Sequence, residues 1–368
     1  MIKLVHIISD SNIGGAGRYL LTFLRNYDRE QYDVAVILPK GSKLATEIDV
    51  PVHEVGGLAE KSFSWRGVWE IRRTLKVIGG VDIVHTHGAV SGRIAAKQAG
   101  VKHITYTRHS VFEPPKGLKG LVRRMMNGVL NSWIKCDVIA VAEAAKQNAV
   151  DEGVPAKRVK VVYNGVERLG ERSDDEKKAF LEQYGLKWGV PTCAIAARLT
   201  AVKGQKYIVW AAKILKDKEI GCQFVIAGTG EDEEELKELV VSLGVEDCVA
   251  IAGFVTDVEL LMNTMDLQLN ASYGTEAASL SLLEGMSLGK PAIVSDYGGN
   301  PELIKDGVNG CITKQHAPDE IAACITKVLE DKQLWEKMRQ NSREIYEAGF
   351  TAKIMTEAMQ EFYRELMK

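Results

Sequence analysis

Short apolar runs rich in β-branched residues alternate with stretches of helical composition along most of this chain. Runs of about six such residues, bounded by polar segments, are typical of buried strands. Eleven of them are found, at 3–8, 33–39, 82–87, 103–108, 137–142, 159–164, 192–197, 222–228, 248–253, 266–270 and 291–295. This alternation predicts an α/β protein in which helices wind around parallel sheets, with ligands bound at the carboxyl ends of the strands.

The alternation is interrupted between Gly165 and Pro191, where the charged stretch ERLGERSDDEKK replaces it. A chain of 368 residues can form two cores of ordinary size. We therefore predict two doubly wound domains, residues 1–170 and 171–368, that face each other across a cleft. The last run, 351–367, has apolar positions at helical spacing and is predicted to pack back on the first domain.

The composition is that of a soluble globular protein, with 46% apolar and 26% charged residues. No apolar run approaches the roughly 20 residues that span a bilayer. The six cysteines show no paired short spacing, and the first residues do not form a signal peptide. These features lead us to expect a cytoplasmic protein, with peripheral contact to a membrane as an option.

Charge is divided unevenly, although the net charge is only −2. Residues 1–170 hold 25 basic and 16 acidic residues, and the remainder holds 22 and 33. A basic first domain suggests an anionic partner there, such as a phosphorylated acceptor, a lipid headgroup or a nucleic acid.

Two segments of the first domain combine cations with large apolar residues. The segment 116–135 contains Lys116, Lys119, Arg123 and Arg124 among apolar side chains, and could lie on an anionic membrane. A surface helix with an ordinary buried face is the favoured interpretation. Trp65 and Trp69, which stand near arginines, receive the same interpretation.

In the second domain, Glu276 and Glu284 flank the start of an apolar helix that follows a strand. A helix that begins near Ser279 and Leu280 would direct unpaired backbone N–H groups at a phosphate. On one continuous helix the two carboxylates would stand about 12 Å apart, so they can border one ligand only if Glu276 lies in the preceding loop. A capping box formed by Ser281 and Glu284 is an equally good explanation.

Two cations, Arg198 and Lys203, follow the strand at 192–197 and precede a helix expected from Gly204. Such a pair can clamp a diphosphate, because Arg supplies a planar fork of donors and Lys a mobile charge.

A cluster of glycines, Gly14, Gly15 and Gly17, follows the first strand. It would let the backbone approach a ligand, although a tight βα turn explains it equally well. The third glycine of the dinucleotide fingerprint is missing, so a nicotinamide cofactor is not expected.

Three histidines, His85, His87 and His109, lie at or just past predicted strand ends of the first domain. An imidazole there could orient a sugar or acceptor hydroxyl. A metal site is not favoured, because no acidic or cysteine partner stands at ligand spacing. The sequence also contains no Asp-x-Asp, which argues against binding a nucleotide sugar through a divalent metal.

Taken together, these motifs resemble the retaining glycosyltransferases of family 4, which have the GT-B fold of two Rossmann-like domains. The resemblance covers nearly the whole chain. Its components, in order, are the glycine loop 14–17, HTHG 85–88, His109, YNGV 163–166, RLTAVKG 198–204, GTGE 228–231 and the Glu-x7-Glu motif 276–284. Ala197 and Ala277 depart from it, because the family often has glycine at these positions.

The resemblance implies a role for each candidate residue. Arg198 and Lys203 would hold the donor diphosphate, together with the helix start at Ser279 and Leu280 and the glycine loop. Glu284 would bind the ribose and Glu276 the transferred sugar. His109 would face the anomeric centre, and the base would lie near Phe254 and Val255.

The implied reaction moves a sugar from a nucleoside diphosphate, most commonly UDP, to an acceptor hydroxyl with retention of configuration. The acceptor would be a glycan, a lipid-linked sugar or a small molecule, and neither a metal nor another cofactor nor a nucleic acid is expected. A nucleotide-sugar epimerase, a non-catalytic nucleotide-sugar or glycan-binding protein, and a glycosidase that uses Glu276 and Glu284 are the alternatives.

Overall fold

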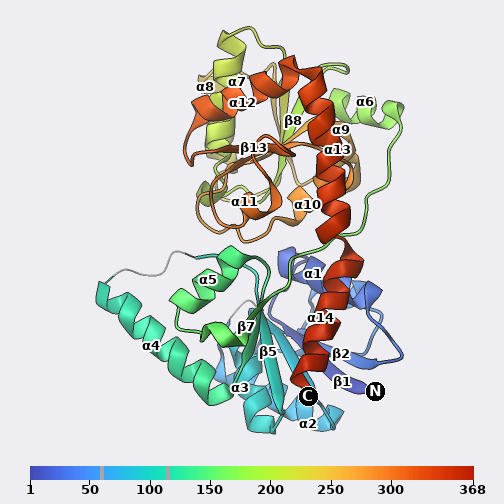
Figure 1. The fold of residues 1–368 in the computed structure, drawn as a ribbon, viewed down its shortest axis with the longest axis vertical. Coiled ribbons are helices and arrows are strands. Elements are labelled where there is room, and N and C mark those ends of the chain that lie inside the picture. The colour runs from blue at the N-terminus through green and yellow to red at the C-terminus, as the bar shows by residue number, and fades with distance from the viewer. Residues whose placement is uncertain (59–61, 113–116) are drawn as a thin grey trace. The chain divides into compact units, whose positions relative to one another are not determined.

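The structure, a computed structural model, describes residues 1–58, 62–112 and 117–368. The chain divides into two compact units (Figure 1). Unit 1 comprises Met1–Val166 and Ala352–Lys368, and unit 2 is the uninterrupted stretch Glu167–Thr351. The change from one unit to the other at residue 167 falls in the charged stretch where the strand pattern is interrupted.

Unit 1 contains a seven-stranded parallel sheet in the order β3-β2-β1-β4-β5-β6-β7. Its strands are β1 (Ile2–Ile8), β2 (Tyr32–Pro39), β3 (Val52–Val55), β4 (Ile83–His87), β5 (His103–Arg108), β6 (Asp137–Ala140) and β7 (Val159–Val161). Its helices are α1 (Gly15–Asn26), η1 (Lys43–Glu47), α2 (Trp65–Ile78), α3 (Val90–Ala99), α4 (Gly117–Ile134), α5 (Glu143–Asp151), η2 (Ala156–Arg158) and α14 (Ala352–Leu366). The central strands are buried along most of their length, as in a parallel sheet covered on both faces.

Unit 2 contains a six-stranded parallel sheet in the order β10-β9-β8-β11-β12-β13. Its strands are β8 (Thr192–Ala196), β9 (Gln223–Ala227), β10 (Val249–Gly253), β11 (Leu267–Asn270), β12 (Ala292–Ser295) and β13 (Gly310–Thr313). Its helices are α6 (Asp174–Gln183), η3 (Ala201–Lys203), α7 (Gln205–Asp217), α8 (Glu233–Ser242), α9 (Val258–Thr264), α10 (Leu280–Ser287), α11 (Asn300–Leu303), α12 (Pro318–Glu330) and α13 (Lys332–Gly349).

Both sheets reverse their strand order next to the first strand of the unit. The reversal lies between β1 and β4 in unit 1 and between β8 and β11 in unit 2. Ligands of doubly wound sheets bind at this switch point, outside the carboxyl ends of the strands. We therefore expect a ligand-binding site at the loops that follow these four strands.

The predicted α/β class with two doubly wound domains is confirmed, and all eleven predicted strands are present. Two further strands, β3 and β13, were not predicted. Each has only four residues, VHEV and GCIT, and neither forms an apolar run. They pair at sheet edges, where a short strand needs little apolar surface of its own.

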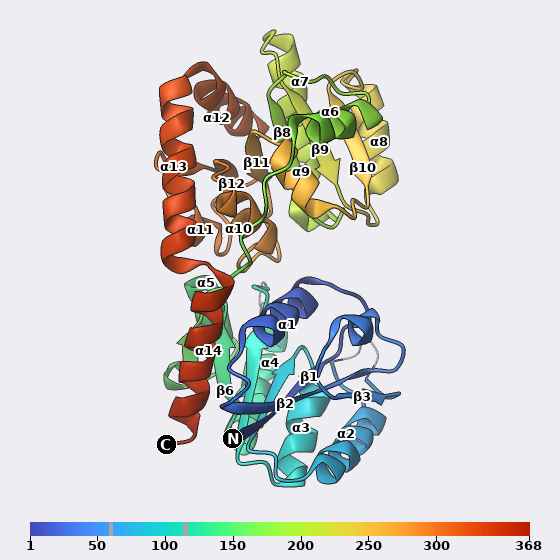
Figure 2. The same cartoon turned by 90° about the vertical axis from the view of Figure 1, so that its right-hand side faces the viewer.

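Helix α14 packs on unit 1 beside α1, as Figure 2 shows. The Tyr32 hydroxyl donates to the backbone oxygen of Gln360 at 3.0 Å, and Lys160 pairs with Glu365 at 2.7 Å. Tyr363 of the same helix is fully buried. The last residues of unit 1 are therefore part of its core, although 185 residues of unit 2 separate them from the rest.

Helix α4 contradicts the buried face that the sequence favoured for segment 116–135. Only Asn131 and Ile134 of this helix are buried, and seven of its large apolar side chains are exposed. Lys116 lies outside the described residues. Helix α2, by contrast, buries Val68 and Ile71 on an ordinary apolar face. Among the described residues, no helix has the length and apolar character needed to cross a bilayer.

Candidate functional site

An ion pair joins the loops that follow β8 and β11 at the switch point of unit 2. The Nζ atom of Lys203 lies 2.8 Å from Oε2 of Glu276, whose residue is only 6% exposed. Asn270 Nδ2 and Ser272 Oγ donate to the same oxygen, each at 3.2 Å. With three donors on one oxygen, the carboxylate is fixed in place and in turn positions the Lys203 ammonium group.

Two glycines permit close backbone contacts around this ion pair, one in the loop after β8 and one after β12. Gly204 and Gly298 both have positive φ angles, of 71° and 60°. A Cβ atom at Gly204 would lie 2.2 Å from the Ala271 oxygen, and one at Gly298 would lie 1.9 Å from the Glu276 oxygen. No side chain fits at either position unless the backbone of Ala271 or Glu276 moves, which is why glycine stands there.

Replacing Gly298 with alanine should destabilise unit 2 by about 3 kcal/mol, because left-handed backbone strain adds to overpacking against Glu276. Gly307→Ala is the matched control. Gly307 has a φ of 71° and nothing within 4 Å of its Cβ position, so it bears the strain alone, about 1 kcal/mol. Urea unfolding of both variants measures the difference, and equal costs would contradict the contact with Glu276.

Arg198 lies in the same loop as Lys203, with an exposed side chain. Its backbone oxygen accepts a hydrogen bond from Gln205 Nε2 at 2.9 Å. The loop after β9 packs against the backbone on either side of Arg198. Cβ atoms at Gly228 and Gly230 would come within 2.0 Å of the backbone oxygens of Ala197 and Leu199. The glycines of GTGE thus act through packing, a role that only the structure reveals.

Helix α10 begins at Leu280, with Ser279 as its N-cap residue. The Ser279 hydroxyl accepts a hydrogen bond from the Leu282 backbone N–H at 3.3 Å. The capping box of Ser281 and Glu284 is therefore wrong, because Ser281 is already inside the helix. Glu284 is buried on the helix, and Glu276 lies in the preceding loop, which is the arrangement that lets both carboxylates border one ligand.

Phe254 and Val255 follow β10, which β9 separates from β8 in the sheet. Phe254 is 75% exposed, and Val255 packs partly against the apolar cluster of α9. Of the predicted residues of unit 2, the structure thus brings Lys203 and Glu276 into direct contact, and the two candidate base contacts lie further along the sheet edge.

The glycine loop of unit 1 does not need glycine for its turn. Gly14 is the N-cap residue of α1 with a φ of −89°, and neither Gly15 nor Gly17 has a positive φ. A Cβ at Gly15 would meet nothing within 4 Å, whereas one at Gly17 would lie 3.0 Å from the Leu44 side chain. Packing explains Gly17, while Gly15 leaves an open approach to the start of the helix.

His109 is joined to a chain of buried imidazoles. Its Nε2 lies 3.0 Å from Nδ1 of His87, and Nε2 of His87 lies 3.1 Å from Nδ1 of His6. Burial lowers the pKa of His109 to about 4 and that of His6 to about 3. All three rings are neutral at pH 7, so each contact can contain one N–H donor and one acceptor.

The sequence missed His6 as a partner of the other histidines. His6 pairs in register with His85 on the adjacent strand, and the ligand atoms of His6, His85 and His87 lie within 4.8 Å of one another. Both ring nitrogens of His85 already have partners, namely Thr107 and Tyr363, and those of His87 also have partners. A metal would have to displace these bonds, so the geometry favours a hydrogen-bonded core.

Each unit of the chain matches a known protein family. Residues 176–345 match the family described as "Glycosyl transferases group 1". Residues 13–168 match the family described as "Glycosyltransferase Family 4".

Several characterised or solved proteins are similar to the chain. The putative glycosyltransferase EpsD of Bacillus subtilis is 30% identical, over 71% of this chain and 71% of that protein. A UDP-Gal:alpha-D-GlcNAc-diphosphoundecaprenol alpha-1,3-galactosyltransferase of Escherichia coli is 25% identical, over 100% of this chain and 97% of that protein. The crystal structure of Anabaena HepE with UDP-glucose has a TM-score of 0.84 at 22% identity, covering 99% of this chain and 100% of that one.

Proposed function

Since this chain belongs to the GT-B glycosyltransferases that these two families describe, we propose that it transfers a hexose from a nucleoside diphosphate to an acceptor hydroxyl with retention of configuration. The observation that carries this proposal is the Lys203–Glu276 pair. The pair fixes a cation in the loop after β8, at the switch point where the ligands of such sheets bind.

The three cationic elements of unit 2 suit a diphosphate leaving group. Glu276 holds Lys203 in place before the reaction, and this lysine, together with Arg198 and the N-terminus of α10, would stabilise the charge that develops on the leaving phosphate, without a metal or another cofactor. Glu276 acts by orienting Lys203 and contacts the transferred sugar, and Glu284 binds the ribose. The roles of His109, the glycine loop, Phe254 and Val255 stay predictions from the family resemblance.

The reaction that we propose needs no protein side chain to accept the proton of the acceptor hydroxyl. The bond between the anomeric carbon and the diphosphate oxygen breaks, and the acceptor oxygen bonds to the same face of the sugar. The acceptor proton passes to the leaving phosphate. We assign no carboxylate to the opposite face of the sugar, and we therefore propose this same-face route in place of a double displacement.

UDP is the proposed nucleotide of the donor. The HepE structure contains UDP-glucose, and the name of the E. coli relative specifies UDP-Gal. That name also specifies a lipid-linked acceptor, and we propose a lipid-linked sugar or glycan acceptor in cell-surface polysaccharide or glycolipid biosynthesis. A cytoplasmic location fits the six free cysteines.

Thermal unfolding with a panel of UDP-, GDP- and ADP-sugars tests the donor. A ligand at a hundred times its dissociation constant adds about 2.7 kcal/mol, so a UDP-sugar should raise the Tm clearly. Release of UDP that requires an acceptor then identifies transfer. Formation of a new sugar epimer from the donor alone would identify an epimerase, and binding without any release would identify a non-catalytic protein. No stabilisation by any nucleotide sugar would overturn the proposal.

A further inference from the structure

Helix α4 exposes a continuous row of large apolar side chains. Seven of them are between 47% and 76% exposed. We call them the α4 stripe; they are Leu118, Leu121, Val122, Met125, Met126, Val129 and Trp133.

The stripe occupies one face of the helix. Its members are three or four positions apart, and at about 100° per residue this spacing aligns them along a single side. The two buried residues, Asn131 and Ile134, stand on the opposite side. The helix is therefore amphipathic in the reverse of the usual sense, because its apolar face points away from the core of unit 1.

Specific contacts hold the helix in this orientation. On the inner side, Arg123 pairs with buried Glu152 at 2.8 Å, and Arg93 donates to Asn131 Oδ1 at 3.3 Å. Gly153 has a φ of 96°, and a Cβ there would lie 2.5 Å from the Arg124 backbone oxygen. The turn after α5 thus packs directly on the backbone of α4. Turning the stripe inward would break the buried ion pair and this close contact.

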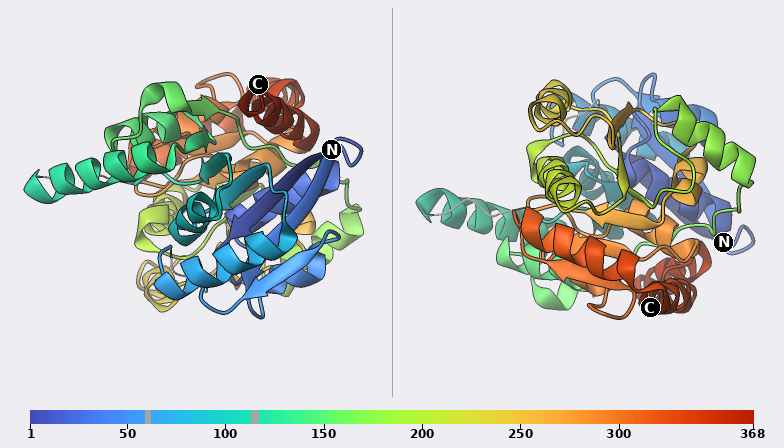
Figure 3. Two further views of the ribbon diagram at one scale, coloured as in Figure 1. Left: turned by 90° about the horizontal axis from the view of Figure 1, so that it is seen from below. Right: turned by 90° about the horizontal axis from the view of Figure 1, so that it is seen from above.

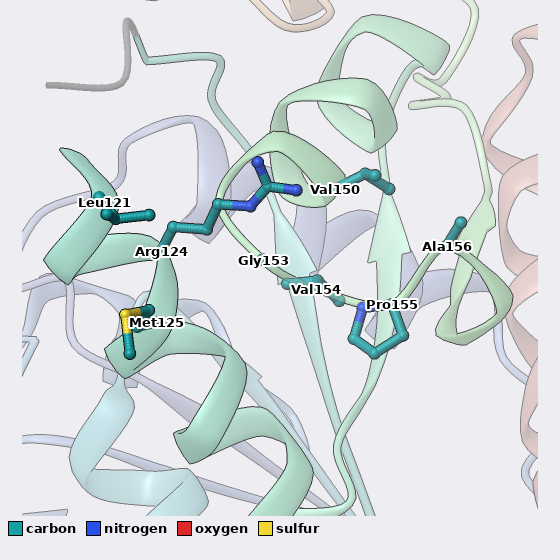
Figure 4. Close-up of a pocket in the computed structure, with 8 residues that line it drawn as sticks. All are labelled: Leu121, Arg124, Met125, Val150, Gly153, Val154, Pro155 and Ala156. Carbon is teal, nitrogen blue, oxygen red and sulfur yellow. The ribbon is translucent and has the colours of Figure 1, made fainter. Parts of the chain in front are cut away.

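The stripe continues into a shallow apolar groove beside the helix, shown in Figure 4. Leu121 and Met125 line one wall, and the segment Val154–Ala156 lines the other. The Arg124 side chain extends across the groove toward Val150 (Figure 4). In the views of Figures 1 and 3, α4 runs along the periphery of unit 1. An apolar surface is thus available along the length of the helix.

The charged residues of α4 indicate what kind of partner binds to the stripe. Residues 117–134 contain no Asp or Glu, whereas Lys119, Arg123 and Arg124 lie on the helix and Lys135 follows it. A second copy of the chain seated on the stripe would bring two sets of these cations together and be opposed by their repulsion. A surface with negative headgroups above an apolar interior matches both the cations and the stripe.

We propose that α4 is a docking surface for an anionic lipid bilayer. The stripe enters the boundary between headgroups and acyl chains, while Lys119 and Arg124 contact lipid phosphates. The docking itself does not depend on the transfer reaction. Only one consequence rests on the proposed function, namely that the acceptor is carried by a lipid and meets the enzyme at the membrane surface.

Flotation of the full chain with phosphatidylcholine vesicles, with and without phosphatidylglycerol, tests the docking. We expect wild-type protein to float with the anionic vesicles and poorly with the neutral ones. Added salt should weaken the binding, because salt screens the attraction between the basic side chains and the lipid phosphates. The triple variant Val122→Ser, Met126→Ser, Val129→Ser changes only exposed side chains and should lower the bound fraction about tenfold or more.

A matched control is available on helix α2. Trp65 and Trp69 are 70% and 60% exposed, beside arginines, but on a helix whose apolar face is buried. The double variant Trp65→Ser, Trp69→Ser should float like wild type. Lys119→Gln with Arg124→Gln should reduce binding to the anionic vesicles only.

Results of two kinds would overturn the proposal, one from flotation and one from light scattering. One is a triple variant that floats as well as wild type, or wild type that does not float with anionic vesicles. The other is a dimer of the wild-type chain, measured by light scattering without vesicles, that the triple variant disperses, because the stripe would then bind a second copy. Neither result depends on donor or turnover, so a failure of docking is distinguishable from a failure of the transferase assignment, which thermal stabilisation by UDP-sugars measures.

Discussion

Replacing Lys203 with alanine is expected to lower kcat for the nucleotide-sugar donor about a hundredfold, the usual cost of losing one preorganised donor to a developing negative charge. The structure adds a second effect. Without the ammonium group, the buried Glu276 carboxylate loses its counter-ion at 2.8 Å and opposes the incoming diphosphate. Calorimetry with UDP should therefore show weaker binding as well as slower turnover.

The double variant Lys203→Ala, Glu276→Gln separates the two effects. Glutamine removes the negative charge, so the double variant should bind UDP more tightly than Lys203→Ala alone, while its kcat stays low. Lys213→Ala, a partly exposed position on helix α7 where the lysine pairs with Asp217, is the control and should change neither quantity. If the single and double variants bind UDP equally, the unpaired Glu276 carboxylate does not oppose the diphosphate.

The stability of unit 1 is expected to fall steeply as the pH drops below about 6.5, because three buried histidines resist protonation. His6, His85 and His87 are fully buried, and burial lowers the folded-state pKa of His6 to about 3 and those of the other two well below 6.5. The unfolded chain takes up protons below about 6.5 that the folded chain does not, so the free energy of unfolding decreases with falling pH.

The expected decrease in the free energy of unfolding is large. Each histidine contributes up to about 1.4 kcal/mol per pH unit, and the three together up to about 4. Between pH 6.5 and 5 the loss from these three is about 5 kcal/mol, comparable with the roughly 5–15 kcal/mol that stabilises a domain. Urea unfolding across this range measures it. His6→Phe should reduce the slope by about a quarter, because the lowered pKa of His109 contributes to the slope as well. A wild-type slope near zero would contradict the buried neutral chain.

The sequence predicted the elements that local patterns determine. The apolar runs located the central strands of both sheets, and the polar residues before α10 located its start. Arg198 and Lys203 were selected because they lie in the loop after a strand, and strand ends of a parallel sheet meet at one edge; their role in donor binding stays a prediction. These predictions depend on a few neighbouring residues and a rule of topology.

Other features depend on contacts between distant residues. The partnership of His6 with His85 and His87 requires the register of β1 and β4, which their separate sequences do not contain. The spacing of apolar residues on α4 predicted a helix with one apolar face, but not the direction of that face. That direction is set by Glu152 and Gly153, which lie beyond β6. The wrong interpretation arose because periodicity records a pattern and not its surroundings.

The return of α14 to unit 1 has a consequence for the order in which the chain folds during synthesis. Residues 167–351 contain all of unit 2, whereas unit 1 lacks Tyr363 and the other buried residues of α14 until 352–368 have emerged. At about 5–20 residues per second, the first unit waits roughly 10–40 s for its final helix. The second unit in the sequence is thus the first to be complete, and His85 lacks its Tyr363 partner until then.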